Sequence, residues 1–449
     1  MTLRFGTDGV RGVANVELTT ELVLGLGRAA ARVLDADVPF IVGRDTRRSG
    51  PMIEAALVAG LCAEGADVEL VGILPTPGVA ALAAARHAPA AVISASHNPF
   101  PDNGVKLFAA GGRKLTADAE ANVEMELGAL IGSGSIAGDS GTGVGTARAL
   151  PGARDEYVTG LVGALAGRTL DGLRVVLDCG HGAAFEAAPE VLRRLGADVE
   201  VHNVEPDGTN INAGCGSTDP SSLRAAVVAS GAHAGLAFDG DADRVIAIDE
   251  HGDIVDGDHM LCIAAIDLAS RDALRGNAVV VTVMSNLGLR HALAGRGIEV
   301  VETPVGDRHV ISVLAERGLA LGGEQSGHII FADHATTGDG TLTGIMLLDA
   351  MARTGRPLSE LAAVMKSFPQ VLRNVRVADR AALDAAALDT AVAAGIAELG
   401  DDGRVLVRPS GTEPVVRVMV EAASAGQADQ VAARLVDAVE LAYGRPTTS

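Results

Sequence analysis

The sequence has little of what several common binding modes require. Aromatic residues make up 2% of its 449 residues and tryptophan is absent, so flat platforms for stacking a sugar ring are not expected. The four cysteines are scattered and form no CxxC pair, which argues against a zinc site and against a disulfide framework. No GxxxxGKS or GxxxxGKT loop occurs, which removes the commonest nucleoside triphosphate site. Recognition of a small ligand should therefore rest on hydrogen bonds and charge.

The chain is also short of positive charge. Its 36 Lys and Arg residues stand against 57 Asp and Glu residues, a net charge of −21, so neither nucleic acid nor an anionic membrane is an expected partner. No run of 18 uncharged apolar residues is present, and the start of the chain lacks the apolar segment of a signal peptide, so we expect a cytoplasmic protein. An anionic ligand would need cations concentrated locally.

What the sequence does contain is an alternation of short apolar runs with Ala- and Leu-rich helical patterns. The runs at residues 40–42, 91–93, 175–177 and 279–281 are typical of buried strands. Strands that alternate with helices predict an α/β fold with parallel or mixed sheets. One helix should open with Thr20 as its N-cap. At ~100–200 residues per domain, the length predicts three or four domains.

The most informative segment is ISASHN at residues 93–98, which follows one of these apolar runs. A Pro/Asp/Asn/Gly turn comes next and ends the strand, so Ser96 should lie at the mouth of that strand. With His97 beside it and Lys106 ten residues further on, Ser96 is placed like a nucleophile. The alternative is an ordinary polar turn, for which Ser, His and Asn are common residues.

Three aspartates alternate along the chain between two apolar runs, at positions 239, 241 and 243. Carboxylates this close repel one another unless a cation neutralises them, and their oxygens suit Mg²⁺, Mn²⁺ or Ca²⁺. An EF-hand loop is one alternative, with Glu250 at its twelfth position, but Arg244 stands where the sharp turn needs glycine. A solvated acidic turn is another alternative. A divalent cation held by Asp239, Asp241 and Asp243 is the better prediction.

Two further polar segments have the composition of binding loops. The first is RPSGTEP at residues 408–414, followed by Arg417; its arginines, hydroxyls and flexible glycine suit a phosphate group. A turn capped by Ser410 would use the same letters. The second is GGEQSGH at residues 322–328, whose side chains are of the kind that bind sugar hydroxyls, although a hairpin loop is also consistent with it.

Together these segments resemble the α-D-phosphohexomutase superfamily and, within it, the bacterial phosphoglucosamine mutase family. Five motifs follow the family's order over nearly the whole chain: FGTDGVRG at 5–12, SASHNP at 94–99, DGDADR at 239–244, GGEQSGH at 322–328 and RPSGTEP at 408–414. The glutamine of GGEQSGH is the letter that resembles the glucosamine branch. Pro304 departs from the pattern, because many relatives have lysine there. This leaves Arg308 and His309 as candidates for reaching the sugar.

The resemblance implies a fold of four domains around one deep cleft. Three mixed-sheet α/β domains should be followed by a smaller C-terminal α+β domain. The implied domains span residues 1–149, 150–250, 251–367 and 368–449, and would carry the phosphoserine, the metal, the sugar and the second phosphate in that order. The implied partner is a small phosphosugar, and a homodimer is compatible with the resemblance.

The resemblance also implies roles for individual residues. Phosphorylation of Ser96 would activate the enzyme, and Ser96 would hold Mg²⁺ together with Asp239, Asp241 and Asp243. The implied catalytic residues are Ser96, His97, Lys106, Arg11 and Arg244. The implied substrate-binding residues are Glu324, Ser326, His328, Arg308, Arg408, Ser410, Gly411, Thr412 and Arg417. Either Lys106 or His97 would act as general acid and base.

The implied reaction is the interconversion of glucosamine 6-phosphate and glucosamine 1-phosphate through a bound 1,6-bisphosphate. It would feed the synthesis of UDP-N-acetylglucosamine and cell-wall precursors. Three alternatives remain: a phosphomannomutase or phosphoglucomutase, a Mg²⁺-dependent phosphohydrolase using the three aspartates, and a non-catalytic phosphosugar-binding protein. An intact Ser96 beside an intact aspartate loop argues against the last of these, since a sensor has no use for both.

Overall fold

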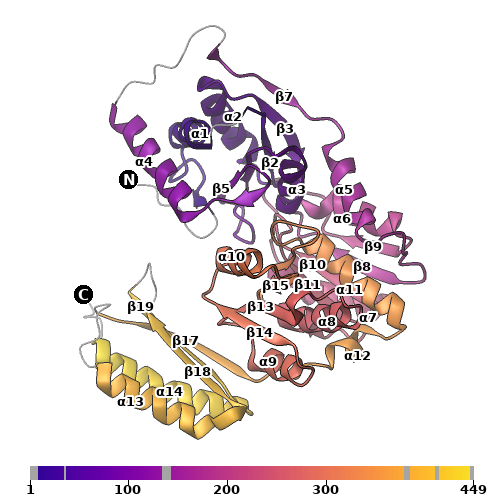
Figure 1. The fold of residues 1–449 in the computed structure, drawn as a ribbon, viewed down its shortest axis with the longest axis vertical. Coiled ribbons are helices and arrows are strands. Elements are labelled where there is room, and N and C mark those ends of the chain that lie inside the picture. The colour runs from indigo at the N-terminus through magenta and orange to yellow at the C-terminus, as the bar shows by residue number, and fades with distance from the viewer. Residues whose placement is uncertain (1–8, 35–36, 134–142, 379–384, 410–413, 445–449) are drawn as a thin grey trace. The chain divides into compact units, whose positions relative to one another are not determined.

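A computed structural model describes residues 9–34, 37–133, 143–378, 385–409 and 414–444 (Figure 1). The chain divides into two compact units. The first comprises Met1–Met284 and Gly297–Val364, and the second comprises Ser285–Arg296 and Met365–Ser449. Strands and helices alternate through the first unit, as the sequence pattern predicts.

The first sheet of the first unit carries the Ser96 segment at the end of a central strand. Its strands run in the order β1-β5-β4-β2-β3-β7, with β6 paired to β5. They are β1 (Val10–Val13), β2 (Phe40–Arg44), β3 (Val68–Ile73), β4 (Ala90–Ile93), β5 (Asp102–Ala109), β6 (Arg113–Lys114) and β7 (Ala147–Ala149). The sheet is mixed, because β2 is parallel to β3 and β4 whereas β5 is antiparallel to β4 and β1.

Four helices accompany this sheet and build its core. They are α1 (Thr20–Leu34), α2 (Gly50–Ala63), α3 (Thr76–Arg86) and α4 (Ala117–Ser133). Two glycines let α1 and α2 approach closely: a Cβ on Gly27 would lie 2.3 Å from the Leu57 carbonyl oxygen, and one on Gly60 would lie 2.1 Å from that of Leu24. The helices therefore pack tightly over the strand that leads to Ser96.

The second and third sheets have the orders β12-β11-β10-β8-β9 and β14-β13-β15-β16. Their strands are β8 (Arg174–Asp178), β9 (Asp198–His202), β10 (Ala234–Phe238), β11 (Val245–Asp249), β12 (Ile254–Val255), β13 (Ala278–Thr282), β14 (Glu299–Thr303), β15 (Leu321–Gly323) and β16 (Ile329–Phe331). Both sheets are mixed, since β11 is antiparallel to β10 and β16 is antiparallel to β15. The second sheet extends past residue 250, because β12 pairs with β11.

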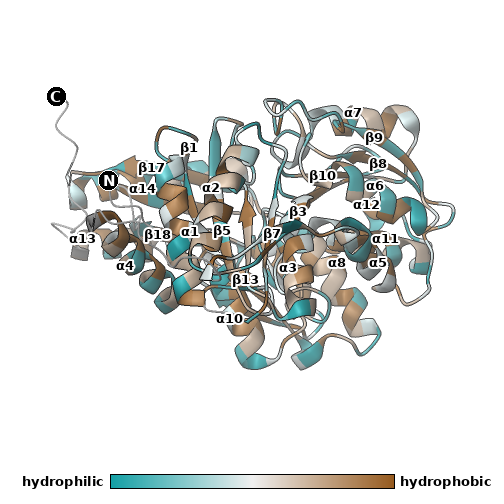
Figure 2. Cartoon of the chain, turned by 90° about the horizontal axis from the view of Figure 1, so that it is seen from above, coloured by the Kyte–Doolittle hydropathy of each residue, from teal (hydrophilic) through white to brown (hydrophobic). Residues whose placement is uncertain are grey.

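Helices flank these two sheets as well. They are α5 (Ala153–Gly163), α6 (Ala184–Arg194), α7 (Ser221–Ser230), α8 (Gly257–Ser270), α10 (Asp307–Arg317), α11 (Gly340–Thr354) and α12 (Leu358–Ala362). Short 3₁₀ turns occur at Gly216–Thr218 and Arg275–Asn277, and a third lies in the second unit at Gly400–Asp402. Figure 2 shows apolar and polar residues sharing most helices, as expected when one helix face covers a sheet.

Local sequence explains where these elements begin and end. All five residues of β10 and of β13 are buried, as continuous apolar runs in central strands should be. The Asp339 carboxylate accepts the Leu342 N–H at 2.9 Å and so caps the start of α11. Helix α1 begins at Thr20, but the hydroxyl that accepts an N–H, from Leu22 at 3.3 Å, belongs to Thr19. The predicted N-cap is therefore corrected by one residue.

The second unit is built on a smaller, antiparallel sheet with the order β17-β19-β18. Its strands are β17 (Gln370–Arg376), β18 (Arg404–Pro409) and β19 (Val415–Glu421), and its helices are α9 (Leu287–Ala294), α13 (Ala385–Leu399) and α14 (Ala425–Tyr443). Figure 1 shows α13 and α14 side by side along this sheet. Across both units, none of the helices in the described ranges is long and apolar enough to cross a membrane.

Candidate active site

Ser96 lies just beyond β4, in a turn with an unusual backbone. Its φ is +52°, in the left-handed region that residues other than glycine seldom adopt. The side chain is buried, and its Oγ donates to Asp239 Oδ2 at 2.6 Å and lies 3.3 Å from His97 Nδ1. The hydroxyl is thus directed at the aspartate loop. An ordinary solvated turn does not account for this arrangement.

Asp239, Asp241 and Asp243 lie in the loop between β10 and β11. All three are buried, and one oxygen from each lies within 4.8 Å of the others. Lys106 bridges two of them, with its Nζ 2.7 Å from Asp241 Oδ2 and 2.9 Å from Asp243 Oδ2. The other oxygens of these two residues, both Oδ1, are buried and accept no hydrogen bond from the described part of the chain. Hard oxygen donors with lone pairs left over fit a divalent cation.

The flanks of this loop decide against an EF-hand. The loop joins two antiparallel strands, whereas an EF-hand loop joins two helices. Glu250, which would be the last ligand of an EF-hand, instead accepts a hydrogen bond from the Ser359 N–H at 3.3 Å. The three aspartates therefore form their own cluster.

The charge of the cluster is incompletely balanced. Burial raises the pKa of Asp239, and the neighbouring carboxylates of Asp243 and Asp241 raise it further. Burial also acts against ionisation of Asp243, but Lys106, His328 and Arg244 together outweigh it, and the pKa of Asp243 is lowered. The aspartate loop thus carries more negative charge than Lys106 neutralises. A divalent cation would remove this excess.

Cationic side chains surround the Ser96 hydroxyl on its other sides. Arg244 Nη1 lies 2.9 Å from His97 Nδ1, so Nδ1 is an acceptor and the ring proton is on Nε2. Burial lowers the pKa of His97, and the charges of Arg244 and Arg11 lower it further. Arg11 lies on β1 opposite Gly104 of β5. A neutral imidazole is therefore held beside Ser96 among permanent cations.

The GGEQSGH segment forms the tight turn between β15 and β16. Gly327 has a φ of +89°, and a Cβ there would lie 1.9 Å from the Val245 carbonyl oxygen, so glycine allows the turn to seat against β11. Glu324 accepts the Gly306 N–H at 3.3 Å through Oε1, and its Oε2 accepts the hydroxyl of the exposed Ser326 at 3.3 Å. The segment is a hairpin turn, and it also presents polar groups beside the strand that follows the aspartate loop.

Two residues with a predicted sugar-binding role have protein partners. His328 is buried, with its Nδ1 3.6 Å from Asp243 Oδ1 and its Nε2 accepting the Gly338 N–H at 3.1 Å. Arg308 forms an ion pair with Glu120 of α4 at 2.5 Å. His328 therefore lies against the aspartate loop, and Arg308 joins α10 to α4.

Arg408 and Arg417 lie directly opposite each other on β18 and β19 of the second unit. Both are half-buried, and neither forms an ion pair with another described residue. Burial lowers the pKa of Arg408, and the charge of Arg417 lowers it further. Ser410, Gly411 and Thr412, predicted to bind the same phosphate, lie outside the described residues. Two adjacent guanidinium groups suit an anion.

Thr76, which opens α3, contacts the aspartate loop although no sequence motif points to it. Its Oγ1 donates to Asp241 Oδ2 at 2.5 Å, and its N–H donates to the Asp241 carbonyl oxygen at 2.9 Å. The side chain is buried. Because Thr76 and Asp241 are 165 residues apart in the chain, no local pattern signals the contact.

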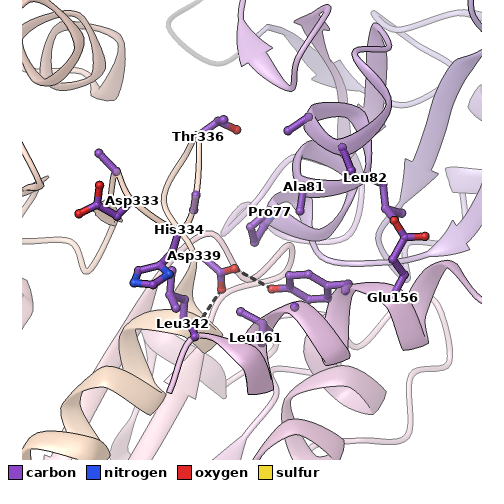
Figure 3. A pocket seen from close by; sticks show the side chains of 17 residues that line it. Pro77, Ala81, Leu82, Glu156, Leu161, Asp333, His334, Thr336, Asp339 and Leu342 are labelled. Carbon is purple, nitrogen blue, oxygen red and sulfur yellow. Dashed lines mark hydrogen bonds between the residues drawn. The ribbon is translucent and has the colours of Figure 1, made fainter. Parts of the chain in front are cut away.

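A cavity of about 460 Å³ lies elsewhere in the first unit, between α3, α5 and residues 332–342 (Figure 3). The Tyr157 hydroxyl donates to Asp339 Oδ2 at 2.9 Å in its wall. Burial raises the pKa of Asp339 to about 6. None of the residues that line this cavity is one of the predicted site residues, so it is distinct from the serine and aspartate site.

Comparison with known proteins gives the family. Four successive segments match the phosphoglucomutase/phosphomannomutase domains: domain I at residues 2–130, domain II at 155–252, domain III at 256–368 and the C-terminal domain at 372–438. The phosphoglucosamine mutases of Streptomyces avermitilis and Desulforudis audaxviator are each 53% identical to the chain, covering 98% and 97% of it and 99% and 97% of their own lengths. The chain belongs to the phosphoglucosamine mutase family.

Solved structures show the same fold for this phosphoglucosamine mutase family member. A phosphoglucomutase/phosphomannomutase family protein of Burkholderia thailandensis matches with a TM-score of 0.81 and 27% identity, over 97% of this chain and 96% of its own. Aspergillus fumigatus N-acetylphosphoglucosamine mutase, solved with GlcNAc-6P and magnesium, matches with a TM-score of 0.71 and 18% identity, over 98% and 96%. The predicted phosphohexomutase architecture and the prediction of an isomerase of this family are both confirmed.

Proposed function

We propose that the protein interconverts glucosamine 6-phosphate and glucosamine 1-phosphate, with Ser96 as the phosphoryl carrier. The observation that carries this proposal is the 2.6 Å contact between Ser96 Oγ and Asp239, one of three buried carboxylates that fit a metal ion. The contact joins a group able to carry phosphate to a group able to hold its counter-cation. It occurs in a chain that is 53% identical to phosphoglucosamine mutases.

Two phosphoryl transfers make up the reaction. Phospho-Ser96 first gives its phosphoryl group to the free sugar hydroxyl: the bond from Oγ to phosphorus breaks, a bond from the sugar oxygen to phosphorus forms, and the hydroxyl proton leaves. The resulting 1,6-bisphosphate turns round and returns its other phosphate to Ser96, and a proton goes back to the sugar oxygen that is released. Either Lys106 or His97 would act as general acid and base; His97 could accept a proton at Nδ1 only after this nitrogen lost its hydrogen bond from Arg244, and the ammonium of Lys106 is suited to donate one.

The remaining residues bind and neutralise. Mg²⁺ held by Asp239, Asp241, Asp243 and the Ser96 phosphate would offset the charge that develops on the transferring phosphoryl oxygens. Arg11 and Arg244 approach the same oxygens. The residues proposed to hold the sugar and its second phosphate are Glu324, Ser326, Arg308, Arg408, Ser410, Gly411, Thr412 and Arg417, and the buried His328 would support the Asp243 carboxylate behind them. Exclusion of water from phospho-Ser96 would protect it from hydrolysis.

The deciding experiment measures product identity. Purified protein with Mg²⁺ and a trace of glucose 1,6-bisphosphate is given the 6-phosphate of glucosamine, glucose or mannose separately, and hexose 1-phosphate and free phosphate are quantified. Preferred conversion of glucosamine 6-phosphate without phosphate release is expected. Preference for another sugar would keep the mechanism and change the substrate. Stoichiometric phosphate release without any 1-phosphate would contradict mutase chemistry.

A further inference from the structure

Two side chains from distant parts of the sequence hold the backbone of the Ser96 turn. The carbonyl oxygen of Ser96 accepts hydrogen bonds from Arg47 Nη2 at 2.8 Å and from Asn212 Nδ2 at 2.9 Å. The carbonyl oxygen of Asn98 accepts from the same two nitrogens, at 2.8 Å and 3.2 Å. Both lone pairs of each carbonyl thus have a side-chain donor.

The Arg47 side chain donates all of its hydrogen bonds to this turn and to Asp45. It is 0% exposed, and its Nη1 donates to the carbonyl oxygens of Pro99 at 2.6 Å and Asp102 at 3.1 Å. Its Nε donates to Asp45 Oδ2 at 2.9 Å, and Asp45 is also 0% exposed. A buried guanidinium is tolerated when its charge and its donors are all matched, as they are here. Its planar fork fixes the relative positions of four carbonyls at once.

The same carboxylate closes a loop back to Ser96 itself. Asp45 Oδ2 accepts the Ser94 hydroxyl at 2.7 Å, and Ser94 Oγ accepts the Ser96 N–H at 2.9 Å. The N–H and the carbonyl of Ser96 are therefore both tied to the Asp45–Arg47 ion pair. Such a network defines one conformation when every member is satisfied.

Asn212 reaches the turn from the second domain, 116 residues away in sequence. Its backbone has a φ of +57°. The glycine of the DGDADR motif makes room for it: a Cβ on Gly240 would lie 2.5 Å from the Ser96 carbonyl oxygen and 3.0 Å from Asn212 Nδ2. Asn212 thus donates to the serine turn from a position against the loop that carries the aspartates.

The hydrogen bonds from Arg47 and Asn212 to the Ser96 turn, together called the clamp, oppose relaxation of its backbone. A left-handed conformation is unfavourable for a residue other than glycine, so the Ser96 turn would relax if it were not held. Relaxation would change the direction of Cβ and move Oγ away from Asp239. The clamp bonds act only on the backbone, and they leave the Ser96 hydroxyl free to carry a phosphoryl group.

We infer that Arg47 and Asn212 are positioning residues, which hold the Ser96 turn in the conformation that directs its oxygen at the aspartate cluster. The inference rests on the proposed role of Ser96 as phosphoryl carrier. Neither residue would touch the substrate, so their loss should slow phosphoryl transfer and leave substrate affinity nearly unchanged.

The sharper test is Asn212→Gly, because glycine accepts a φ of +57° and lacks only the donor. Asn277→Gly is the matched control: Asn277 has a φ of +48°, is exposed, and gives one side-chain bond, to the Gly297 carbonyl oxygen at 2.7 Å. We expect Asn212→Gly to lower kcat by ~10–100-fold, as a displacement of about 1 Å would, with KM changed less than ~3-fold. The control should keep wild-type kcat at a similar melting temperature.

A direct readout separates positioning from folding. Dephosphorylated protein is mixed with glucose 1,6-bisphosphate, and the rate of Ser96 phosphorylation is followed by intact-protein mass spectrometry. This rate should fall in Asn212→Gly by the same factor as kcat. Arg47→Lys, which keeps the charge beside Asp45 but cannot span four carbonyls, should lose more. If Arg47→Lys fails to fold, Asn212→Gly still decides.

Two results would overturn the clamp: wild-type kcat and phosphorylation rate in Asn212→Gly, or a raised KM with unchanged kcat. A wild-type enzyme that turns over while Ser96 never acquires phosphate would instead overturn the proposed function. The two failures are therefore distinguishable, because the first is seen in the variant and the second in the wild type.

Discussion

The Ser96 site of the first unit and the Arg408–Arg417 pair of the second unit use charge in opposite ways. At Ser96 buried charges of opposite sign lie in contact, as Lys106 does with Asp241 and Asp243. On the C-terminal sheet, two half-buried arginines face each other across neighbouring strands. Like charges directly opposite on a sheet destabilise it, so this pair favours binding an anion.

The difference agrees with the roles proposed for the two places, a first end at Ser96 where a phosphate reacts and a second end at Arg408 and Arg417 where a phosphate is only held. A reacting phosphate needs groups fixed within a fraction of an ångström, and buried, mutually bonded groups supply that fixity. A phosphate that is only held needs charge and donors, and two arginine forks supply them with tolerance for its exact position. Mutations at the first end should therefore affect turnover, and mutations at the second should affect binding.

The largest effect is expected at the first end, from loss of the Ser96 hydroxyl. Ser96→Ala and Ser96→Gly should each lower kcat by ~10³-fold or more, since the group that carries the phosphoryl is gone. Glycine relieves the left-handed strain and alanine does not, so equal losses in the two variants would assign the effect to the hydroxyl. Turnover of glucosamine 6-phosphate is the measurement. A variant that retains near-wild-type kcat would remove Ser96 from the mechanism.

The next largest effect should come from the aspartate cluster. Asp241→Asn keeps the shape but removes a charge, so the Mg²⁺ concentration for half-maximal activity should rise by ~10–100-fold. Titration of activity with Mg²⁺ measures it. Asp253→Asn is the control, because Asp253 is 78% exposed beyond the neighbouring strand and should leave the titration unchanged. An unaltered curve in Asp241→Asn would count against Asp241 as a metal ligand.

At the second end, Arg417→Ala should raise KM for the phosphosugar by ~10–100-fold, the value of one charge-assisted bond, and change kcat much less. Arg373→Ala is matched to it: Arg373 lies on the same sheet, is 58% exposed and pairs with Asp429. Steady-state kinetics on both variants give the comparison. A fall in kcat at constant KM would show that this end also acts on the chemistry.

The smallest effect on activity is expected at Asp339, a buried carboxylate outside the proposed catalytic groups, where the measurable effect is on stability. Burial raises its pKa from 3.8 to about 6 in the folded protein. The folded state therefore binds this proton more tightly, and the wild type should lose stability relative to Asp339→Asn as the pH rises from about 4 to about 6, by ~3 kcal/mol at most. Denaturant unfolding of both proteins at several pH values measures the difference. A constant difference across this range would contradict the raised pKa.

The features of this protein that depend on residues adjacent in the sequence can be predicted from it. The α/β fold follows from apolar runs such as those of β10 and β13, and Ser96 and the aspartates follow from motifs of six residues or fewer. The contacts that complete the site are not contiguous. Thr76 and Asp241 are 165 residues apart, and Asn212 and Ser96 are 116 apart. Such pairs depend on how the sheets pack, which no local periodicity encodes.

The role of a polar residue also depends on its hydrogen-bond and ion-pair partners in the folded protein. His328 belongs to a motif that suggests sugar contact, yet its imidazole is buried between Asp243 and the Gly338 N–H. Arg308 is a candidate for the sugar from its sequence neighbourhood, and it is paired with Glu120. Residue type alone cannot reveal these partners, because they come from other helices and loops.

Helix α9 has a consequence for how the protein can be divided. The Asn286 side chain both donates to and accepts from the Phe368 backbone at 2.9 Å, and the Leu287 N–H donates to the buried Glu421 at 3.1 Å. The chain accordingly passes between the two units three times, after residues 284, 296 and 364. A chain truncated at residue 367 would lose Phe368 and Glu421, the partners of Asn286 and Leu287 at the start of α9. The C-terminal unit consists of two separate segments of the polypeptide, so a single cut after residue 364 would remove only the second segment and leave α9 in the remaining chain.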